Sequence, residues 1–250
     1  MAVSIEVSEE AGVRYLHFGS RWIQGAMRVA RPYSLELEYT RLMMLPLLLR
    51  SGARWPRQTL LIGLGAASLA KFLYRHRPDA GLTVVEIEPG VVSAARQFFK
   101  LPVDPKRLNI VIGEGHDVLA ESPATFDLIA VDGYDARGRT GMLDTSPFYW
   151  NARAHLGSRG MVVTNLMSRV RGKPPPIDAI RQAFDGRAIA LPPCEGGNTI
   201  VVAASGDPID MSFTVLSAAA RRLKEDTGLN LLPTVAGMAS RSSRNERFVL

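Results

Sequence analysis

Short apolar runs and longer amphipathic segments alternate along the chain from residue 58 onward. The runs are rich in aliphatic and β-branched residues and have no polar face, which is typical of strands covered by helices on both sides. They predict seven strands, at residues 59–62, 82–88, 108–115, 126–132, 160–166, 187–191 and 198–204. Helices are predicted between them at residues 68–75, 90–99, 117–121 and 146–155. This alternation predicts an α/β fold with a central sheet whose last pair of strands is antiparallel.

The start of the chain has a different pattern. Apolar and polar residues alternate between positions 3 and 7, and residues 13–18 and 22–29 form two further segments of strand character. The three segments predict a small antiparallel sheet. A helix is predicted from about residue 32 to residue 50, and one closing helix over residues 212–224.

These elements predict three parts. Residues 1–50 hold the small sheet and a linking helix, residues 51–205 the main α/β domain, and residues 206–250 the C-terminal helix and a tail. The boundary is placed at residues 51–56, where glycine and proline end the helical pattern.

The turn after the first strand of the main domain is rich in small residues. Gly63 and Gly65 allow the backbone to turn sharply and to approach a ligand, while Ala66 and Ala67 let the next helix pack close to the strand. Ser68 stands where the dinucleotide fingerprint has its third glycine. The turn therefore predicts a nucleotide-binding site, with a plain strand-to-helix turn as the alternative.

Carboxylates follow the next three strands. Glu86 ends the second strand, about twenty residues after the glycine turn, where a carboxylate can accept hydrogen bonds from ribose hydroxyls. Glu114 lies between two glycines at the end of the third strand, and Asp132 ends the fourth. Because parallel strands end at one edge of a sheet, these groups are expected to lie together there.

Composition narrows the class of protein. The 250 residues are 46% hydrophobic, no apolar run is long enough to span a membrane, and the start of the chain lacks the pattern of a secretory signal, so a cytoplasmic protein is expected. One cysteine, Cys194, and four histidines show no metal-site spacing. The net charge of +6 comes from dispersed arginines, so neither nucleic acid nor a membrane is the expected partner.

These motifs, in this order, resemble those of the polyamine aminopropyltransferases, the spermidine synthase family. Residues 60–66 resemble its glycine-rich turn, residues 85–88 its acid pair, residues 113–115 its G-D-G, and residues 132–135 the start of its D-S-S-D-P loop. Residues 19–25, with Gln24, are similar to its D-G-x-x-Q turn. The resemblance covers the chain from the first sheet to about residue 204.

The resemblance implies a Rossmann-like sheet of the adenosylmethionine-dependent methyltransferase type and a homodimer. It implies decarboxylated S-adenosylmethionine as co-substrate, a small amine as the second substrate, and no metal. Glu86 would hold the ribose, Glu114 and the adjacent backbone would hold the adenine, and Asp132 would lie next to the reacting amine. The full set of expected cofactor-binding residues is Gln24, Gly63, Gly65, Glu86, Ile87, Gly113, Glu114 and Asp132.

The amine side carries the catalytic expectations. An ammonium cannot attack carbon, so a carboxylate must take or hold a proton; Asp132 is assigned this task, with Asp135 nearby. Asp135 has an equally weighted alternative reading as a turn residue. Tyr39, Asp135 and Glu195 are the expected substrate-binding residues.

The amine side also departs from the family pattern. Thr40 and Arg41 stand where the family has glutamine and glutamate, and an arginine there would repel a diamine. Residues 136–139 replace the usual proline-containing gate, and no aromatic pair occurs near the sixth strand.

Two other functions remain open at this point. A methyltransferase using intact adenosylmethionine commonly carries an acid two residues before the first glycine, and here that position is Leu61. Arg41, Arg137 or Arg139 could nevertheless hold a methionine carboxylate. A non-catalytic nucleoside-binding protein of the same fold is the third possibility, although it would need no acid at Asp132. Dinucleotide-dependent oxidoreduction is disfavoured by Ser68.

Overall fold

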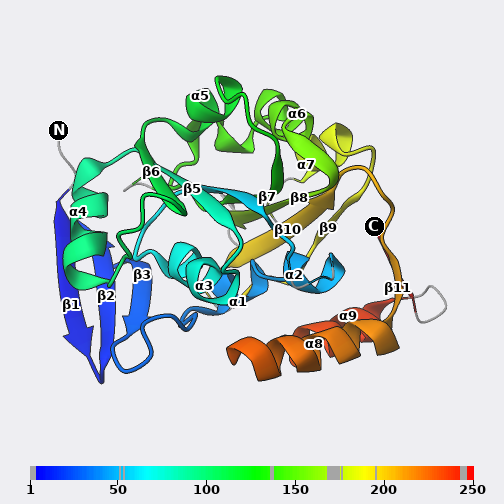
Figure 1. Ribbon diagram of the computed structural model, residues 1–250, viewed down its shortest axis with the longest axis horizontal. Coiled ribbons are helices and arrows are strands. Elements are labelled where there is room, and N and C mark those ends of the chain that lie inside the picture. Colours follow the sequence, from blue (N-terminus) through cyan, green and yellow to red (C-terminus); the bar gives the residue numbers. More distant parts are fainter. Residues whose placement is uncertain are drawn as a thin grey trace.

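The computed structural model shows a layered α/β molecule with a small sheet at one end (Figure 1). The structure describes residues 4–50, 52, 54–135, 138–167, 175, 177–194, 196–242 and 247–250. Within these ranges, every helix is too short or too polar to cross a membrane.

A seven-stranded sheet forms the centre of the molecule. In spatial order its strands are β6 (Leu108–Ile112), β5 (Gly81–Glu86), β4 (Gln58–Ile62), β7 (Phe126–Val131), β8 (Leu156–Met167), β10 (Asn198–Ala204) and β9 (Ala188–Ala190). The first five are parallel, and β10 is antiparallel to both β8 and β9. The predicted seven-stranded sheet and its antiparallel last pair are confirmed.

Helices cover both faces of this sheet (Figure 1). Successive side chains along each strand point to opposite faces of the sheet, where they join two apolar clusters. On β4, Leu61 belongs to the first cluster, and Leu60 and Ile62 belong to the second. The first cluster is covered by α1 (Glu38–Leu42), α2 (Pro46–Leu49), α3 (Ser68–His76), α4 (Pro89–Phe98), α8 (Phe213–Thr227) and α9 (Leu232–Arg241). The second is covered by α5 (Gly115–Ala120), η1 (Gly141–Asp144), α6 (Ser146–Ala154) and α7 (Asp178–Ala183).

The small antiparallel sheet is also confirmed. Its strands are β1 (Ile5–Glu10), β2 (Val13–Phe18) and β3 (Ile23–Arg28). Gly25 on β3 lies against the glycine turn, because a β-carbon added to it would come within 2.6 Å of the Ala66 side chain. The small sheet therefore packs directly on the turn that follows β4.

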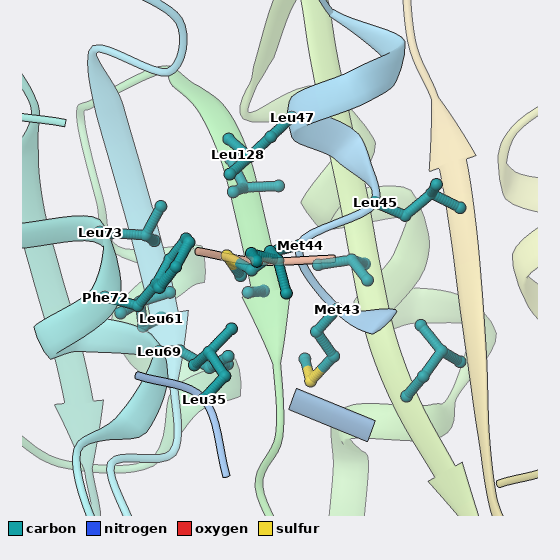
Figure 2. Packing of buried hydrophobic residues seen from close by; sticks show 14 of the residues in the cluster. Leu35, Met43, Met44, Leu45, Leu47, Leu61, Leu69, Phe72, Leu73 and Leu128 are labelled. Carbon is teal, nitrogen blue, oxygen red and sulfur yellow. The ribbon is translucent and has the colours of Figure 1, made fainter. Parts of the chain in front are cut away.

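The single helix predicted from residue 32 to residue 50 is wrong. The structure has two short helices, α1 and α2, preceded by turns. Pro46 lacks the N–H that a continuous helix would direct to the Leu42 carbonyl, and the Leu45 N–H bonds to that carbonyl instead, at 3.0 Å. Figure 2 shows the result: Met43 and Met44, between the helices, pack with Leu69 and Phe72 of α3 above the sheet.

The C-terminal part holds more structure than the sequence predicted. Helix α8 begins at the expected place, where the Ser212 hydroxyl accepts from the Val215 N–H at 3.2 Å. Helix α9 and a two-stranded sheet of β11 (Asp210–Ser212) and β12 (Arg247–Val249) were not expected. The division into parts at residues 50 and 205 stays a prediction.

Candidate functional site

A cavity of about 1050 Å³ opens at the carboxyl edge of the central sheet. The small sheet, α1 and the loops after β4, β5, β6 and β7 form its walls. Ten of the residues predicted from the sequence line it: Gln24, Tyr39, Gly63, Gly65, Glu86, Ile87, Gly113, Glu114, Asp132 and Asp135. Glu195 and Arg137 lie outside the described residues.

The glycine turn after β4 is tightly built. Gly63 has a φ of +95°, and a β-carbon there would lie 2.2 Å from the carbonyl oxygen of Asp132. Gly65 has a φ of +50°, and its β-carbon would lie 3.3 Å from the carbonyl oxygen of Gln24. Glycine thus lets the turn fit between the loop after β7 and the small sheet, with its backbone exposed to the cavity.

Glu86 is fixed at the end of β5. It is 7% exposed, and its Oε2 accepts from the Leu64 N–H at 2.9 Å while its Oε1 accepts from the Glu88 N–H at 3.0 Å. Burial raises the pKa of Glu86, whereas these backbone hydrogen bonds oppose the rise. The carboxylate therefore joins the glycine turn to β5 and faces the cavity in a set orientation.

Glu114 and Ile87 are held less firmly. Both side chains are exposed, and Glu114 is the N-cap residue of α5 without a side-chain capping bond. They follow the adjacent strands β6 and β5, so they border the same end of the cavity.

Asp132 follows β7 and is partly buried. Its Oδ1 accepts from the Nδ2 of Asn165 at 2.8 Å, and the Tyr39 hydroxyl also hydrogen-bonds to the carboxylate. Desolvation raises the pKa of Asp132, and the two hydrogen bonds counteract this rise. Burial and the negative charge of Asp132 hold the pKa of Tyr39 well above its usual range. Asp132 can therefore receive or hold a proton, while Tyr39 stays a neutral donor.

Two asparagines and a tyrosine of this site were missed from the sequence. Asn165 on β8 accepts a hydrogen bond from Asn198 on β10 at 3.0 Å, and the Tyr134 hydroxyl donates to the Asn165 carbonyl at 2.8 Å. A signal existed for Asn165, since an amide stands in the otherwise largely apolar run of residues 160–166, and the structure shows this side chain to be 4% exposed. Asn198 and Tyr134 carried no comparable signal.

Within the loop after β7, Asp135 is linked to Arg139 by an ion pair and by a backbone hydrogen bond. Arg139 contacts its carboxylate at 2.7 Å, and the backbone N–H of Asp135 donates to the Arg139 carbonyl at 2.9 Å. Trp22 of the small sheet lies against the same loop, 3.6 Å from where a β-carbon of Gly138 would be. The turn reading of Asp135 thus has a structural basis, and its carboxylate still lines the cavity.

The arginine that the sequence placed at the amine side lies elsewhere. Arg41 is not among the residues that line the cavity, and its Nη1 donates to the Glu36 carbonyl at 3.1 Å. Thr40 donates its hydroxyl to the Leu37 carbonyl at 2.6 Å. Glu38, from the same helix, lines the cavity in place of Arg41.

The cavity wall is acidic. Among the described residues it carries five carboxylates, of Glu38, Glu86, Glu114, Asp132 and Asp135, and two guanidinium groups, of Arg21 and Arg139. This balance favours ligands that carry positive charge.

Comparisons with known proteins agree with this geometry. The sequence profile described as the spermine/spermidine synthase domain matches residues 37–170. A polyamine aminopropyltransferase of Neisseria meningitidis serogroup A is 32% identical over 241 residues, which cover 96% of this chain and 91% of that protein.

The fold of this chain is shared by solved structures from both of the enzyme classes that the sequence left open. A probable spermidine synthase from Corynebacterium glutamicum superimposes with a TM-score of 0.66 at 20% identity, covering 95% of this chain and 90% of that one. Human methyltransferase-like protein 13, in complex with SAH, gives 0.65 at 22% identity, covering 77% and 93%. The fold therefore does not separate the two classes, but the sequence matches do: the chain belongs to the spermine/spermidine synthase family, as a transferase of the aminopropyltransferase type.

Proposed function

We propose that this protein transfers the aminopropyl group of decarboxylated S-adenosylmethionine to a small amine and releases methylthioadenosine. The observation that carries the proposal is the setting of Asp132, a partly buried carboxylate beside the glycine turn in an acidic cavity. A binding module would need no carboxylate at this point.

The nucleoside half of the ligand is assigned to the strand ends β4, β5 and β6. Glu86 is held in place by the backbone N–H groups of Leu64 and Glu88, and its carboxylate, which lines the cavity, is assigned to the ribose hydroxyls. Gly63 and Gly65 offer close backbone approach, and Glu114, Gly113 and the exposed Ile87 are assigned to the adenine. Gln24 reaches the same space from the small sheet.

The chemical step is a displacement at carbon. The amine must be neutral, so Asp132 takes one proton from the ammonium or holds it while the amine nitrogen forms its bond to the methylene carbon. The carbon–sulfur bond breaks as the new bond forms, and its electron pair goes to sulfur. The charge on the sulfonium is thereby neutralised, and methylthioadenosine leaves.

The charges of the cavity favour the decarboxylated donor. That donor carries a sulfonium and an ammonium, and it matches a wall with five carboxylates. Intact adenosylmethionine adds a carboxylate, for which the described wall offers Arg21 and Arg139, and Arg139 is already paired with Asp135. The same fold serves methyltransferases, so this charge argument is what favours aminopropyl transfer within the site.

The acceptor end is assigned to the side of the cavity formed by α1. Tyr39 and Asp135 keep their proposed role in binding the amine, and Glu195 remains a proposal outside the described residues. Arg41 does not line the cavity and donates to the Glu36 carbonyl, so its guanidinium is directed away from the assigned amine position, and Glu38 adds a negative charge to the wall. We also keep as proposals a homodimer, a cytoplasmic location, and no nucleic-acid or membrane partner.

A two-part experiment tests the proposal. Thermal unfolding is measured with methylthioadenosine, decarboxylated adenosylmethionine and adenosylmethionine, since a ligand of the native state raises the unfolding temperature. Methylthioadenosine release is then measured with putrescine, cadaverine and spermidine as acceptors. Stabilisation by the decarboxylated donor together with amine-dependent release is expected. Binding of nucleosides without release from any amine would reject the transferase assignment.

A further inference from the structure

Three neighbouring strands carry a row of polar side chains along the carboxyl edge of the sheet. Val131, at the end of β7, is paired with Thr164 on β8, so Asp132 comes next to Asn165. Asn165 is in turn paired with Ile200 on β10. Asn198 lies two residues before Ile200, hence on the same face of the sheet and diagonally adjacent to Asn165.

Hydrogen bonds run through this row in one direction. The Nδ2 of Asn198 donates to the Oδ1 of Asn165 at 3.0 Å, and the Nδ2 of Asn165 donates to the Oδ1 of Asp132 at 2.8 Å. The Tyr134 hydroxyl holds the backbone carbonyl of Asn165 at 2.8 Å. The backbone of Asn165 is therefore anchored, and the orientation of its side-chain amide is set by its two neighbours.

The orientation matters because a primary amide has a donor end and an acceptor end of nearly equal shape. Turned one way, Asn165 offers an N–H to Asp132, which suits a carboxylate. Turned the other way, it offers an oxygen, which suits a protonated carboxylic acid and repels the ionised form. Asn198 occupies the oxygen of Asn165 and thus selects the first orientation.

We propose that Asn198 is a positioning residue of the catalytic site: by fixing the amide of Asn165, it keeps a hydrogen-bond donor on Asp132 and so maintains the carboxylate that accepts the amine proton. The inference rests on the proposed function, in which Asp132 is the base. Asn198 itself acts through Asn165, 3.0 Å away, and not through the substrate.

Other groups also act on Asp132. Tyr39 from α1 hydrogen-bonds to it, and the Tyr134 phenol, in the loop after β7, interacts with its charge. Burial raises the pKa of both phenols, so they stay neutral through the acid range. The remaining charged side chains of the described cavity wall are Arg21, Glu38, Glu86, Glu114, Asp135 and Arg139. None of these side chains is altered in the variants below, so differences between variants report on the asparagine row.

The test is a double-mutant cycle of Asn198→Ala and Asn165→Ala, with Asn109→Ala as control. Asn109 is exposed on β6, outside the residues that line the cavity, so this control repeats the asparagine deletion away from the row. For each variant the pH dependence of kcat/KM and the affinity for methylthioadenosine are measured. The titration of the Asp132 carboxyl carbon is followed by NMR in the same proteins. Thermal unfolding confirms that each variant is folded.

The expected result has a specific pattern. Asn165→Ala moves the acid limb of the kcat/KM profile, and the NMR titration midpoint of Asp132, to higher pH by about one unit. At a given pH on that limb, kcat/KM is therefore about tenfold lower than in the unmutated protein. Asn198→Ala moves both in the same direction. The double variant behaves like Asn165→Ala alone, because Asn198 has no effect once the amide it orients is gone. Nucleoside affinity stays within about twofold, and Asn109→Ala resembles the unmutated protein.

Independent effects of the two asparagines, or an unmoved Asp132 titration in Asn198→Ala, would overturn the proposal. Asn198→Asp provides a second variant of nearly the same size. Its carboxylate only accepts, so it draws the N–H of Asn165 away from Asp132, and it also adds a negative charge nearby. Both effects raise the pKa of Asp132, so the shift should exceed that of Asn198→Ala. A smaller shift would contradict the mechanism. Because the NMR titration does not need turnover, a protein that releases no methylthioadenosine would reject the proposed function and still leave the orientation effect measurable.

Discussion

The carboxylate of Asp135 lies 2.7 Å from a guanidinium nitrogen of Arg139, four residues further along the same loop. The Arg139 backbone N–H also donates to this carboxylate, at 2.9 Å. Asp135 was one of the two acids that the sequence assigned to catalysis. Its charge is already balanced within the loop, whereas the Asp132 carboxylate accepts hydrogen bonds from the neutral donors Asn165 and Tyr39.

This difference predicts unequal effects of two conservative substitutions. Asp132→Asn should lower kcat by about a hundred- to ten-thousand-fold, the usual contribution of a general base. Asp135→Asn should lower it by less than about fivefold, since an exposed ion pair is worth about 1 kcal/mol or less. Methylthioadenosine release under saturating donor and amine measures both. If Asp135→Asn lowered kcat as much as Asp132→Asn does, Asp135 would be as important for catalysis as Asp132. Its ion pair with Arg139 would then have to break when the substrates bind.

A second prediction concerns the glycine turn. Gly63→Ala places a β-carbon 2.2 Å from the Asp132 carbonyl oxygen at a φ of +95°, so strain and overlap together should cost about 2–5 kcal/mol of unfolding free energy. Gly12→Ala is the matched control, because its φ is +72° and a β-carbon there meets nothing within 4 Å. Its cost should stay near 1–2 kcal/mol, the strain alone. Chemical denaturation measures both values. Equal losses would show that the turn can move away from Asp132.

Glu86 and Glu114 provide a third prediction, about nucleoside affinity. Glu86→Gln replaces an acceptor of two backbone N–H groups by an amide whose nitrogen faces one of them. The binding free energy of methylthioadenosine should become less favourable by about 1–3 kcal/mol, and the loss in Glu86→Ala should be at least as large. Glu114→Gln should weaken binding less, because the exposed side chain can still accept through its amide oxygen. Calorimetry of the three variants tests this order, and the reverse order would assign the main nucleoside contact to Glu114.

A fourth prediction follows from a lysine inside the first apolar cluster. Lys71 on α3 is 1% exposed and donates to the Phe99 carbonyl at 2.7 Å, and burial lowers its pKa to about 7. Above that pH the folded protein has released this proton, while the unfolded chain holds it up to the ordinary lysine pKa near 10. The unfolded state then binds more protons, so the free energy of unfolding should rise with pH between about 7 and 10.

The slope from this one group should approach about 1.4 kcal/mol per pH unit. Lys71→Met should remove that contribution, and Lys106→Met, at an exposed position, should retain it. Urea denaturation at several pH values gives the difference between the two variants. Parallel stability curves for both would mean that Lys71 titrates normally and that its amine reaches water.

Local sequence determined the elements whose chemistry is carried by neighbouring residues. Short apolar runs that alternate with amphipathic segments favour strands buried on both faces, so the central sheet was predictable, and strands that run parallel bring Glu86, Glu114 and Asp132 to one edge. The glycine turn was predictable for the same reason, since Gly63 and Gly65 sit directly between a strand and a helix. The helix over residues 32–50 was predicted wrongly, because Pro46 has no N–H to donate to the Leu42 carbonyl and the chain forms two short helices instead.

Tertiary structure alone decided which side chains meet across separate strands. Asn165 and Asn198 are distant in sequence, and only the register of β8 against β10 places both on the face that Asp132 shares. Arg41 turns to the Glu36 carbonyl, and Arg139 turns to Asp135, because side-chain direction depends on the fold of α1 and of the loop after β7. Sequence patterns thus located the acids, since burial and turns are local properties. Their partners and orientation required the three-dimensional packing, since hydrogen bonds between strands depend on pairing that no single segment encodes.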